Sequence, residues 1–85
     1  MNVKILFFAS LREQLGSSNM QLELPPGVAT VAALRAHLMI RGDVWQRALG
    51  ERRALRVAVN QDMAQPMTPL KAGDEVAFFP PVTGG

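Results

Sequence analysis

Reactive side chains are scarce in this sequence. It contains one histidine, His37, and no cysteine, which excludes a thiolate nucleophile and a cysteine-based metal site. His37 lies within a helical pattern, one residue from its apolar stripe, and no partner at a suitable spacing would make it a base or a ligand. The serines and the seven carboxylates are dispersed. We therefore expect no metal site and no cofactor bound by the chain itself.

The remaining reactive group is the main-chain carboxylate at the end of the sequence, on Gly85. It closes the stretch DEVAFFPPVTGG, residues 74–85. A terminal carboxylate is ionised at neutral pH, with an unperturbed pKa near about 3.5. It can attack the α-phosphate of ATP, and the resulting acyl adenylate can accept a sulfur or an amine nucleophile. No glycine pattern resembles a phosphate-binding loop, so a separate enzyme would have to bind the ATP.

The residues before that carboxylate predict a stiff and then narrow tail. They are, in order, Pro80, Pro81, Val82, Thr83 and Gly84, followed by Gly85. The two prolines cannot continue a sheet ladder and hold the backbone extended. The two glycines have no Cβ and can pass walls that any side chain would strike. We expect a domain over residues 1–79 and an extended tail over residues 80–85 that enters a channel on another protein.

Length and composition indicate one small domain. The chain has 85 residues, of which 48% are hydrophobic, and a net charge of +2. Its basic residues are scattered, which argues against a nucleic-acid partner. The N-terminus lacks the features of a signal peptide, and no apolar run reaches the roughly 20 residues of a membrane span. We expect a cytoplasmic protein with no membrane partner.

Hydrophobic periodicity predicts an α+β fold. The expected strands span residues 2–8, 20–24, 55–59 and 75–79, with a further short strand near Met63. The main helix is expected over 31–41 with Thr30 as its N-cap, and short helices over 9–15 and 44–49, capped by Ser10 and Asp43. One main helix on a mixed sheet of four or five strands, with the last strand parallel to the first, is a β-grasp, the ubiquitin-like architecture.

Strand alternation separates a core face from an outer face. The inward set comprises Val3, Ile5, Phe7, Met20, Leu22, Leu24, Leu55, Val57, Val59, Val76 and Phe78, covered by Val31, Leu34, Leu38 and Trp45. Arg56 and Ala58 are expected to point outward. So are Phe8 and Phe79, at the ends of two neighbouring strands beside the emerging tail. An exposed aromatic patch favours a partner surface, which Met63 could join; the alternative is that the 9–15 helix or a loop covers it.

Three stretches carry a resemblance to a known family. The C-terminal DEVAFFPPVTGG, VKILFFASLREQLG near the start and VAVNQ at residues 57–61 together resemble the small subunit of molybdopterin synthase. This family is a ubiquitin-like sulfur carrier of molybdenum cofactor biosynthesis. The resemblance extends over the whole chain, and the FFPPVTGG ending is more specific than Gly-Gly alone.

The resemblance implies a function and its partners. An E1-like adenylyltransferase uses ATP to adenylate Gly85, and a sulfur donor protein converts it to a thiocarboxylate. The carrier then inserts its tail into the large, catalytic subunit, where sulfur passes to a pyranopterin precursor to form the dithiolene of molybdopterin. Two carriers and a large-subunit dimer form a heterotetramer, and the carrier is not an enzyme on its own. The family's contacts with its partners imply interface roles for Phe8, Met63, Phe79 and Arg12.

Three other functions fit the same features. The sulfur carrier of thiamine biosynthesis shares the fold and the Gly-Gly end, although it is typically shorter and lacks FFPPVTGG. A ubiquitin-like modifier would join the same carboxylate to lysines of target proteins. A non-reactive β-grasp interaction module would be insensitive to deletion of the last two glycines.

Overall fold

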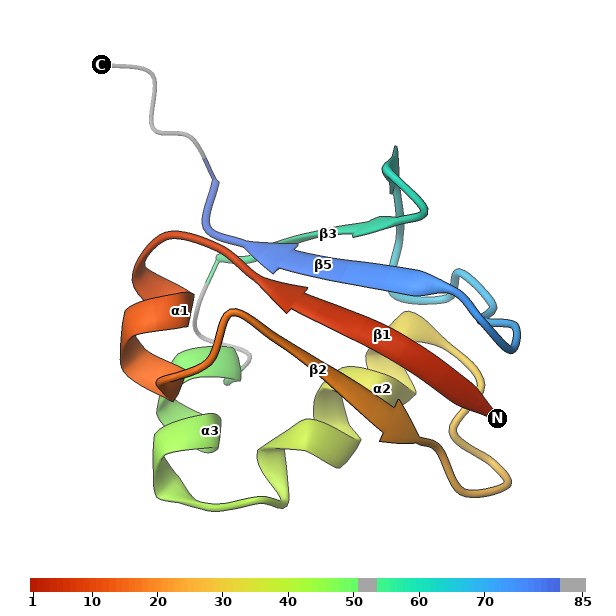
Figure 1. The fold of residues 1–85 in the computed structure, drawn as a ribbon, viewed down its shortest axis with the longest axis horizontal. Coiled ribbons are helices and arrows are strands. Elements are labelled where there is room, and N and C mark those ends of the chain that lie inside the picture. The colour runs from red at the N-terminus through yellow and green to blue at the C-terminus, as the bar shows by residue number, and fades with distance from the viewer. Residues whose placement is uncertain (51–53, 82–85) are drawn as a thin grey trace.

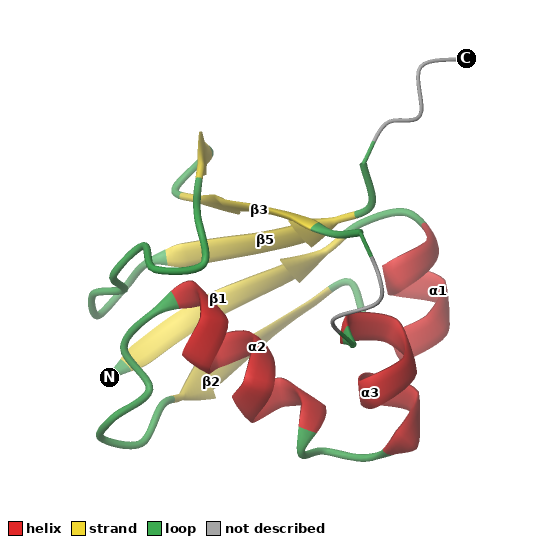
Figure 2. Cartoon of the chain, turned by 180° about the vertical axis from the view of Figure 1, so that it is seen from behind, coloured by secondary structure: helices red, strands yellow, loops and turns green. Residues whose placement is uncertain are grey.

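The computed structural model describes residues 1–50 and 54–81. Its elements are β1 (Asn2–Phe7), α1 (Ser10–Leu15), β2 (Asn19–Glu23), α2 (Val31–Met39), α3 (Asp43–Leu49), β3 (Arg56–Val59), β4 (Asp62–Met63) and β5 (Glu75–Phe79). The strands form one sheet in the order β2-β1-β5-β3-β4, in which β1 and β5 are parallel and the other neighbours antiparallel (Figure 1). The helices cover one face of the sheet (Figure 2). The predicted α+β architecture with a mixed sheet is confirmed.

The two central strands are joined by a pair of aromatic residues. Phe7 of β1 and Phe78 of β5 are direct partners in the parallel register, and their rings stack with centroids 6.2 Å apart. Trp45 of α3 meets the Phe7 ring edge-on at 5.7 Å. Such pairs add about 0.5–1.5 kcal/mol beyond burial alone. The core therefore fixes β1 beside β5, and with them the side of the sheet at which both strands end.

The predicted inward set is confirmed as a whole. Every member is either buried in the core or partly buried against it. In α2, the predicted stripe of Val31, Leu34 and Leu38 is buried. The Oγ1 of Thr30 accepts a hydrogen bond from the backbone N–H of Ala33 at 3.1 Å, so Thr30 is the N-cap that the sequence indicated.

The predicted caps of the two short helices are wrong. Ser10 is the first residue of α1, and the N-cap is Ala9, at a φ of 55° and without a side-chain cap. Asp43 is likewise the first residue of α3, behind Gly42, whose φ of 146° favours glycine. In both places the chain enters the helix through a backbone turn at the preceding residue, so the polar side chain is already inside the first turn.

Half of the predicted boundaries are shifted by one or two residues. β1 ends at Phe7, β2 is displaced by one residue toward the N-terminus, and β3 begins at Arg56. Helix α2 ends at Met39, because Ile40 is already its C-cap. The limits of β5 and the short strand at Met63 are as predicted. Among residues 1–50 and 54–81, no helix is both long and apolar enough to cross a bilayer.

Candidate functional site

A row of apolar residues crosses the sheet on the face opposite the helices. Leu6 of β1 pairs with Ala77 of β5, Ala77 pairs with Ala58 of β3, and Ala58 pairs with Met63 of β4. Residues that pair directly across strands project to the same side of a sheet. Met63 is 59% exposed at the edge of this row. Four strands therefore contribute side chains to one apolar strip.

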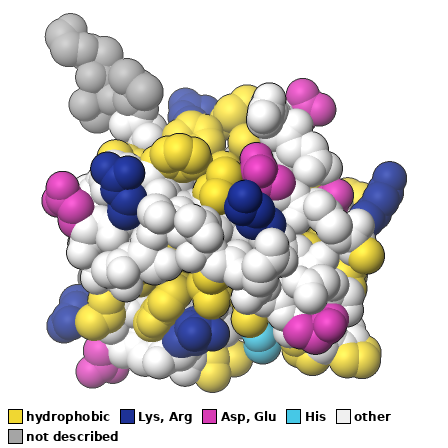
Figure 3. All heavy atoms as spheres, viewed as in Figure 1, with side chains coloured by type: hydrophobic (Ala, Val, Ile, Leu, Met, Phe, Trp, Pro, Cys, Tyr) yellow, Lys and Arg dark blue, Asp and Glu magenta, His cyan; other side chains and the backbone are white. Residues whose placement is uncertain are grey.

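Two phenylalanines extend this strip to the end of the sheet where β1 and β5 finish. Phe8 follows β1 directly, donates its backbone N–H to the Phe78 carbonyl at 3.2 Å, and is 46% exposed. Phe79 is half-buried and alternates with the fully buried Phe78. We call Leu6, Phe8, Ala58, Met63, Ala77 and Phe79 the outer apolar face. Figure 3 shows hydrophobic side chains gathered where β5 ends.

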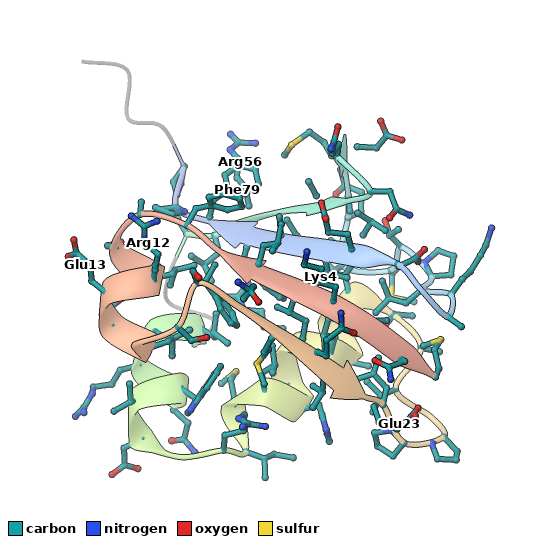
Figure 4. All side chains as sticks on the ribbon, viewed as in Figure 1. Lys4, Arg12, Glu13, Glu23, Arg56 and Phe79 are labelled. Carbon is teal, nitrogen blue, oxygen red and sulfur yellow. The ribbon has the colours of Figure 1, made fainter. Side chains whose placement is uncertain are left out.

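Basic side chains border this end of the face. Arg56 is the direct partner of Phe79 in the pairing of β3 with β5. Arg12 lies on α1, the helix that follows β1. Figure 4 places the two arginines on either side of Phe79. At the other end of the sheet Lys4 pairs with Glu75, so that end is charged with both signs. The end near Phe79 combines aromatic groups with the two arginines and with one carboxylate, Glu13, beside Arg12 on α1.

A polar clamp fixes the turn behind Met63. Asn60 and Gln61, at φ values of 50° and 72°, form the two-residue turn between β3 and β4. The backbone N–H of Asn60 donates to the Glu75 carbonyl at 2.8 Å, and its side-chain Oδ1 accepts from the Glu75 N–H at 3.0 Å. Its Nδ2 donates to the Asp74 carboxylate at 2.9 Å. The turn is thereby fastened to the start of β5.

The hydrogen bonds at this turn change the pKa of the Asp74 carboxyl group. The hydrogen bond from Asn60 lowers the pKa of Asp74 below its usual value, with a further contribution from the backbone N–H of Lys71, which donates to Oδ2 at 2.8 Å. Hydrogen bonds to the ionised form favour that form. Among the described residues, no group of three or more His, Cys, Asp or Glu side chains could hold a metal ion.

The structure describes only the start of the predicted tail. Pro80 and Pro81 follow β5 without belonging to a strand. The predicted binding residues Val82, Thr83 and Gly84 and the reactive Gly85 lie outside the described residues. Of the predicted interface residues, Phe8 and Phe79 lie at adjacent strand ends, Arg12 lies beside them, and Met63 lies at the far edge of the same face.

The sequence did not show which residues connect Phe8 and Phe79 with Met63 across the outer face. Ala58 was expected to point outward, and its pairing with Ala77 and Met63 places it on the outer face. It is nevertheless only 8% exposed, because its small methyl group is shielded by the larger side chains around it. Arg56 was expected outward but had no assigned role. Its pairing with Phe79 depends on the register of two strands that are distant in sequence, and a single sequence does not specify this register.

The mixed sheet, with β1 parallel to β5 and the helices on one face, defines a ubiquitin-like β-grasp protein. The ThiS family matches residues 5–85. Over 83 residues the chain is 48% identical to the molybdopterin synthase sulfur carrier subunit of Haemophilus influenzae and 47% identical to that of Escherichia coli, covering 98% of this chain and 99% of each relative. The chain therefore belongs to the ThiS family, together with the sulfur carrier subunits of molybdopterin synthase.

Solved structures support the same grouping. A putative subunit 1 of the molybdopterin converting factor from Pyrococcus furiosus superimposes with a TM-score of 0.79 at 30% identity, over 96% of this chain and 99% of that one. A chain in the complex of subunits 1 and 2 of the molybdopterin-converting factor from Helicobacter pylori superimposes with a TM-score of 0.70 at 28% identity, over the full length of both chains. SAMP1 from Haloferax volcanii matches at 0.77 and 30%, also with full coverage.

Proposed function

We propose that this chain is the sulfur-carrying subunit of molybdopterin synthase and that Gly85 carries the sulfur. The observation that carries the proposal is the 48% identity to a molybdopterin synthase sulfur carrier subunit over 98% of the chain. The outer apolar face supports it, because it provides a docking surface immediately beside the strand end from which the FFPPVTGG ending continues. Docking there would aim the tail into the partner.

The chemistry begins with activation of the Gly85 carboxylate. An oxygen of that carboxylate attacks the α-phosphorus of ATP on an adenylyltransferase, and pyrophosphate leaves. Hydrosulfide supplied by a donor protein then attacks the acyl carbon and expels AMP, and loss of the sulfur-bound proton leaves a thiocarboxylate. The chain contributes the carboxylate and the docking surface, whereas the partner holds ATP. A mixed anhydride is needed because a free carboxylate does not accept a nucleophile at neutral pH.

The loaded carrier then docks on the large subunit, and the thiocarboxylate sulfur attacks the pyranopterin precursor there. Sulfur transfer returns the carrier to its carboxylate form after hydrolysis of the acyl link. The prolines at positions 80 and 81 reduce the conformational entropy lost when the tail threads into the large subunit. The final glycines let the backbone approach the walls of the site. On this account the carrier has no activity alone, and the whole cycle takes place in the cytoplasm.

The tail can be tested separately from the fold. Gly85→Ala, or one residue appended after Gly85, should leave thermal unfolding unchanged and abolish transfer of sulfur to the precursor. The matched control is Ala72→Ser, an exposed change in the turn before β5, which should transfer sulfur normally. Normal turnover by either tail variant would overturn the proposal.

A ubiquitin-like modifier is the second candidate. The observation that favours it is the match to the small archaeal modifier protein SAMP1 over the full length of both chains. The same acyl adenylate would then be attacked by a lysine amine of a target protein in place of sulfur. Isopeptide-linked conjugates in cells, lost when Gly85 is deleted, would support this activity. The identity to that protein is 30%, against 48% for the sulfur carrier, so we rank it second.

A further inference from the structure

A groove of about 590 Å³ opens between helix α2 and the β3–β4 edge of the sheet. Two of the α2 residues that line it are small, Ala32 and Ala36, which lie one turn apart and are both exposed. Val57 of β3 contributes to the sheet side, and Met63 lies where the groove meets the outer apolar face. Figure 2 shows this side of the fold, with α2 in front of the sheet. Larger side chains at the alanine positions would fill the space.

Backbone hydrogen bonds hold both walls of the groove in place. The chain after β4 runs back to the start of α2, where the Ala32 N–H donates to the Pro66 carbonyl at 2.9 Å and the Val31 N–H donates to the Thr68 carbonyl at 3.1 Å. The Ala64 N–H donates to the Val57 carbonyl at 2.9 Å. The bonds from Val31 and Ala32 satisfy backbone donors in the first turn of α2, which have no partner within the helix. The groove is therefore formed before any partner arrives.

The groove has a definite charge. Its described lining contains two arginines, Arg35 and Arg56, and no Asp or Glu. Arg35 donates through Nε and Nη2 to the carbonyls of Leu49 and Gly50, at 2.5 and 2.7 Å, and so also joins α2 to the end of α3. Arg56 is exposed and borders Phe79. Among the described residues that line this apolar groove, the exposed Arg56 therefore complements an occupant that is apolar and carries a carboxylate.

The outer apolar face is too small to make a stable subunit interface alone. It comprises six residues, and the tail proposed to enter the large subunit, residues 80–85, adds six more, whereas interfaces of standard size use roughly 20–30 residues on each side. Toward β2 and the start of β5 it gives way to the mixed charges of Lys4 and Glu75. Toward β3 and β4 it continues into the groove, because Met63 belongs to the face, Arg56 borders it beside Phe79, and both residues also line the groove.

From this continuity we infer that the groove is the second half of the surface that binds the large subunit. Its occupant is a segment of that subunit with apolar side chains and at least one carboxylate, which passes over Met63 and lies along Ala32 and Ala36 with the carboxylate near Arg56. This inference rests on the proposed function. It adds a docking site remote from the tail, which would allow affinity for the large subunit to be set separately from sulfur chemistry.

Opposite charges at one position test both parts of the inference. Ala36→Glu and Ala36→Lys place side chains of similar length in the groove, on an exposed helix position where both residues are good helix formers. The readout is the Kd of each carrier for its cognate large subunit at low and moderate salt. The glutamate variant should weaken binding about tenfold or more, since it repels the carboxylate. The lysine variant should raise the Kd by a factor several-fold smaller than the glutamate variant does.

Matched controls separate this effect from general charge and from misfolding. Ala72→Glu and Ala72→Lys make the same changes at an exposed alanine in the turn before β5, and both should bind like wild type. All four variants should unfold at the wild-type temperature, and all should be loaded with sulfur normally. If the wild-type chain itself is never loaded, the proposed function fails, whatever the binding of these variants shows.

Three outcomes would overturn the inference. Wild-type affinity for both Ala36 variants would mean that the large subunit does not enter the groove. Equal losses for the glutamate and lysine variants would exclude an acidic occupant. Impaired sulfur loading with unchanged affinity for the large subunit would assign the groove to the adenylyltransferase.

Discussion

Arg56 and Phe79 are direct partners across the β3–β5 pairing, so a guanidinium lies beside the last aromatic residue of the sheet. Phe79 is half-buried, whereas Phe78, one residue earlier, is fully buried. The pair stands at the point where the chain leaves β5 toward Gly85. A partner that receives the tail must pass this pair, which makes it a natural place to test docking.

Phe79→Ala should weaken binding of the large subunit without unfolding the carrier. Truncation of a central aromatic contact typically costs about 2 kcal/mol or more in binding, and the loss of stability should be about 1 kcal/mol because the side chain is only half-buried. Phe78→Ala is the control, and it should cost about 3–5 kcal/mol of folding free energy because it opens a cavity in the core. Titration calorimetry and urea unfolding give the two quantities. Equal destabilisation by both changes would place Phe79 in the core.

Arg56→Glu should act mainly on the rate of association. An exposed charge at the rim of an interface steers encounter, and its effect is screened by salt. We expect an association rate reduced about tenfold at low ionic strength, with the difference shrinking as salt is added. Lys4→Glu, on the same face but at its mixed-charge end, should have a much smaller effect. Stopped-flow mixing of carrier and large subunit measures both; identical rates for the two variants would remove Arg56 from the interface.

Acid should destabilise the chain partly through Asp74. Its pKa is lowered in the folded state by the hydrogen bond from Asn60, so its contribution to stability is present above the unfolded pKa of about 3.9 and is lost as pH falls through the folded value. Asn60→Gly keeps the positive φ accessible and removes both side-chain bonds of Asn60, the one to Asp74 and the one from the Glu75 N–H. It should lower the free energy of unfolding by about 0.5–1 kcal/mol at neutral pH, a figure discounted for exposure.

The difference in unfolding free energy between wild type and Asn60→Gly should narrow as the pH falls from the unfolded pKa of about 3.9 through the lowered folded pKa, below which Asp74 is protonated in both states. Urea unfolding at a series of pH values measures it, with the pKa of Asp74 followed by NMR. A constant difference across the acid range would show that the Asn60 side chain stabilises the fold through the bond that its Oδ1 accepts from the Glu75 N–H and not through the carboxylate.

How much the sequence predicts differs between the core and the outer face. Lys4 and Glu75 mark the outward positions of β1 and β5, so burial of Val3, Ile5, Val76 and Phe78 could be predicted, although the other outward positions are apolar. Exposure of Phe8 followed from the same phase. These strands have apolar residues at every second position, and a shift by one residue would expose the core. The N-caps at Ala9 and Gly42 could not be predicted, because positive φ at those residues is imposed by the chain's path between elements.

The groove and the Arg56–Phe79 pair were inaccessible for a different reason. Both depend on the register of β3 with β5 and on the path of the chain from β4 back to α2, which are contacts between residues distant in sequence. The residue types do not indicate a groove, because alanines at positions 32 and 36 are ordinary helix-forming residues. Only the tertiary structure shows that they leave space beside a face already suited to docking.

The most direct test of the central claim is the intact mass of the protein after incubation with its cognate adenylyltransferase, ATP and a sulfur source. The account predicts a gain equal to sulfur replacing oxygen, which requires ATP and disappears when Gly85 is deleted. Adding the large subunit and the pyranopterin precursor should then return the mass to its starting value as molybdopterin forms. An unchanged mass in the presence of an active adenylyltransferase would contradict the account.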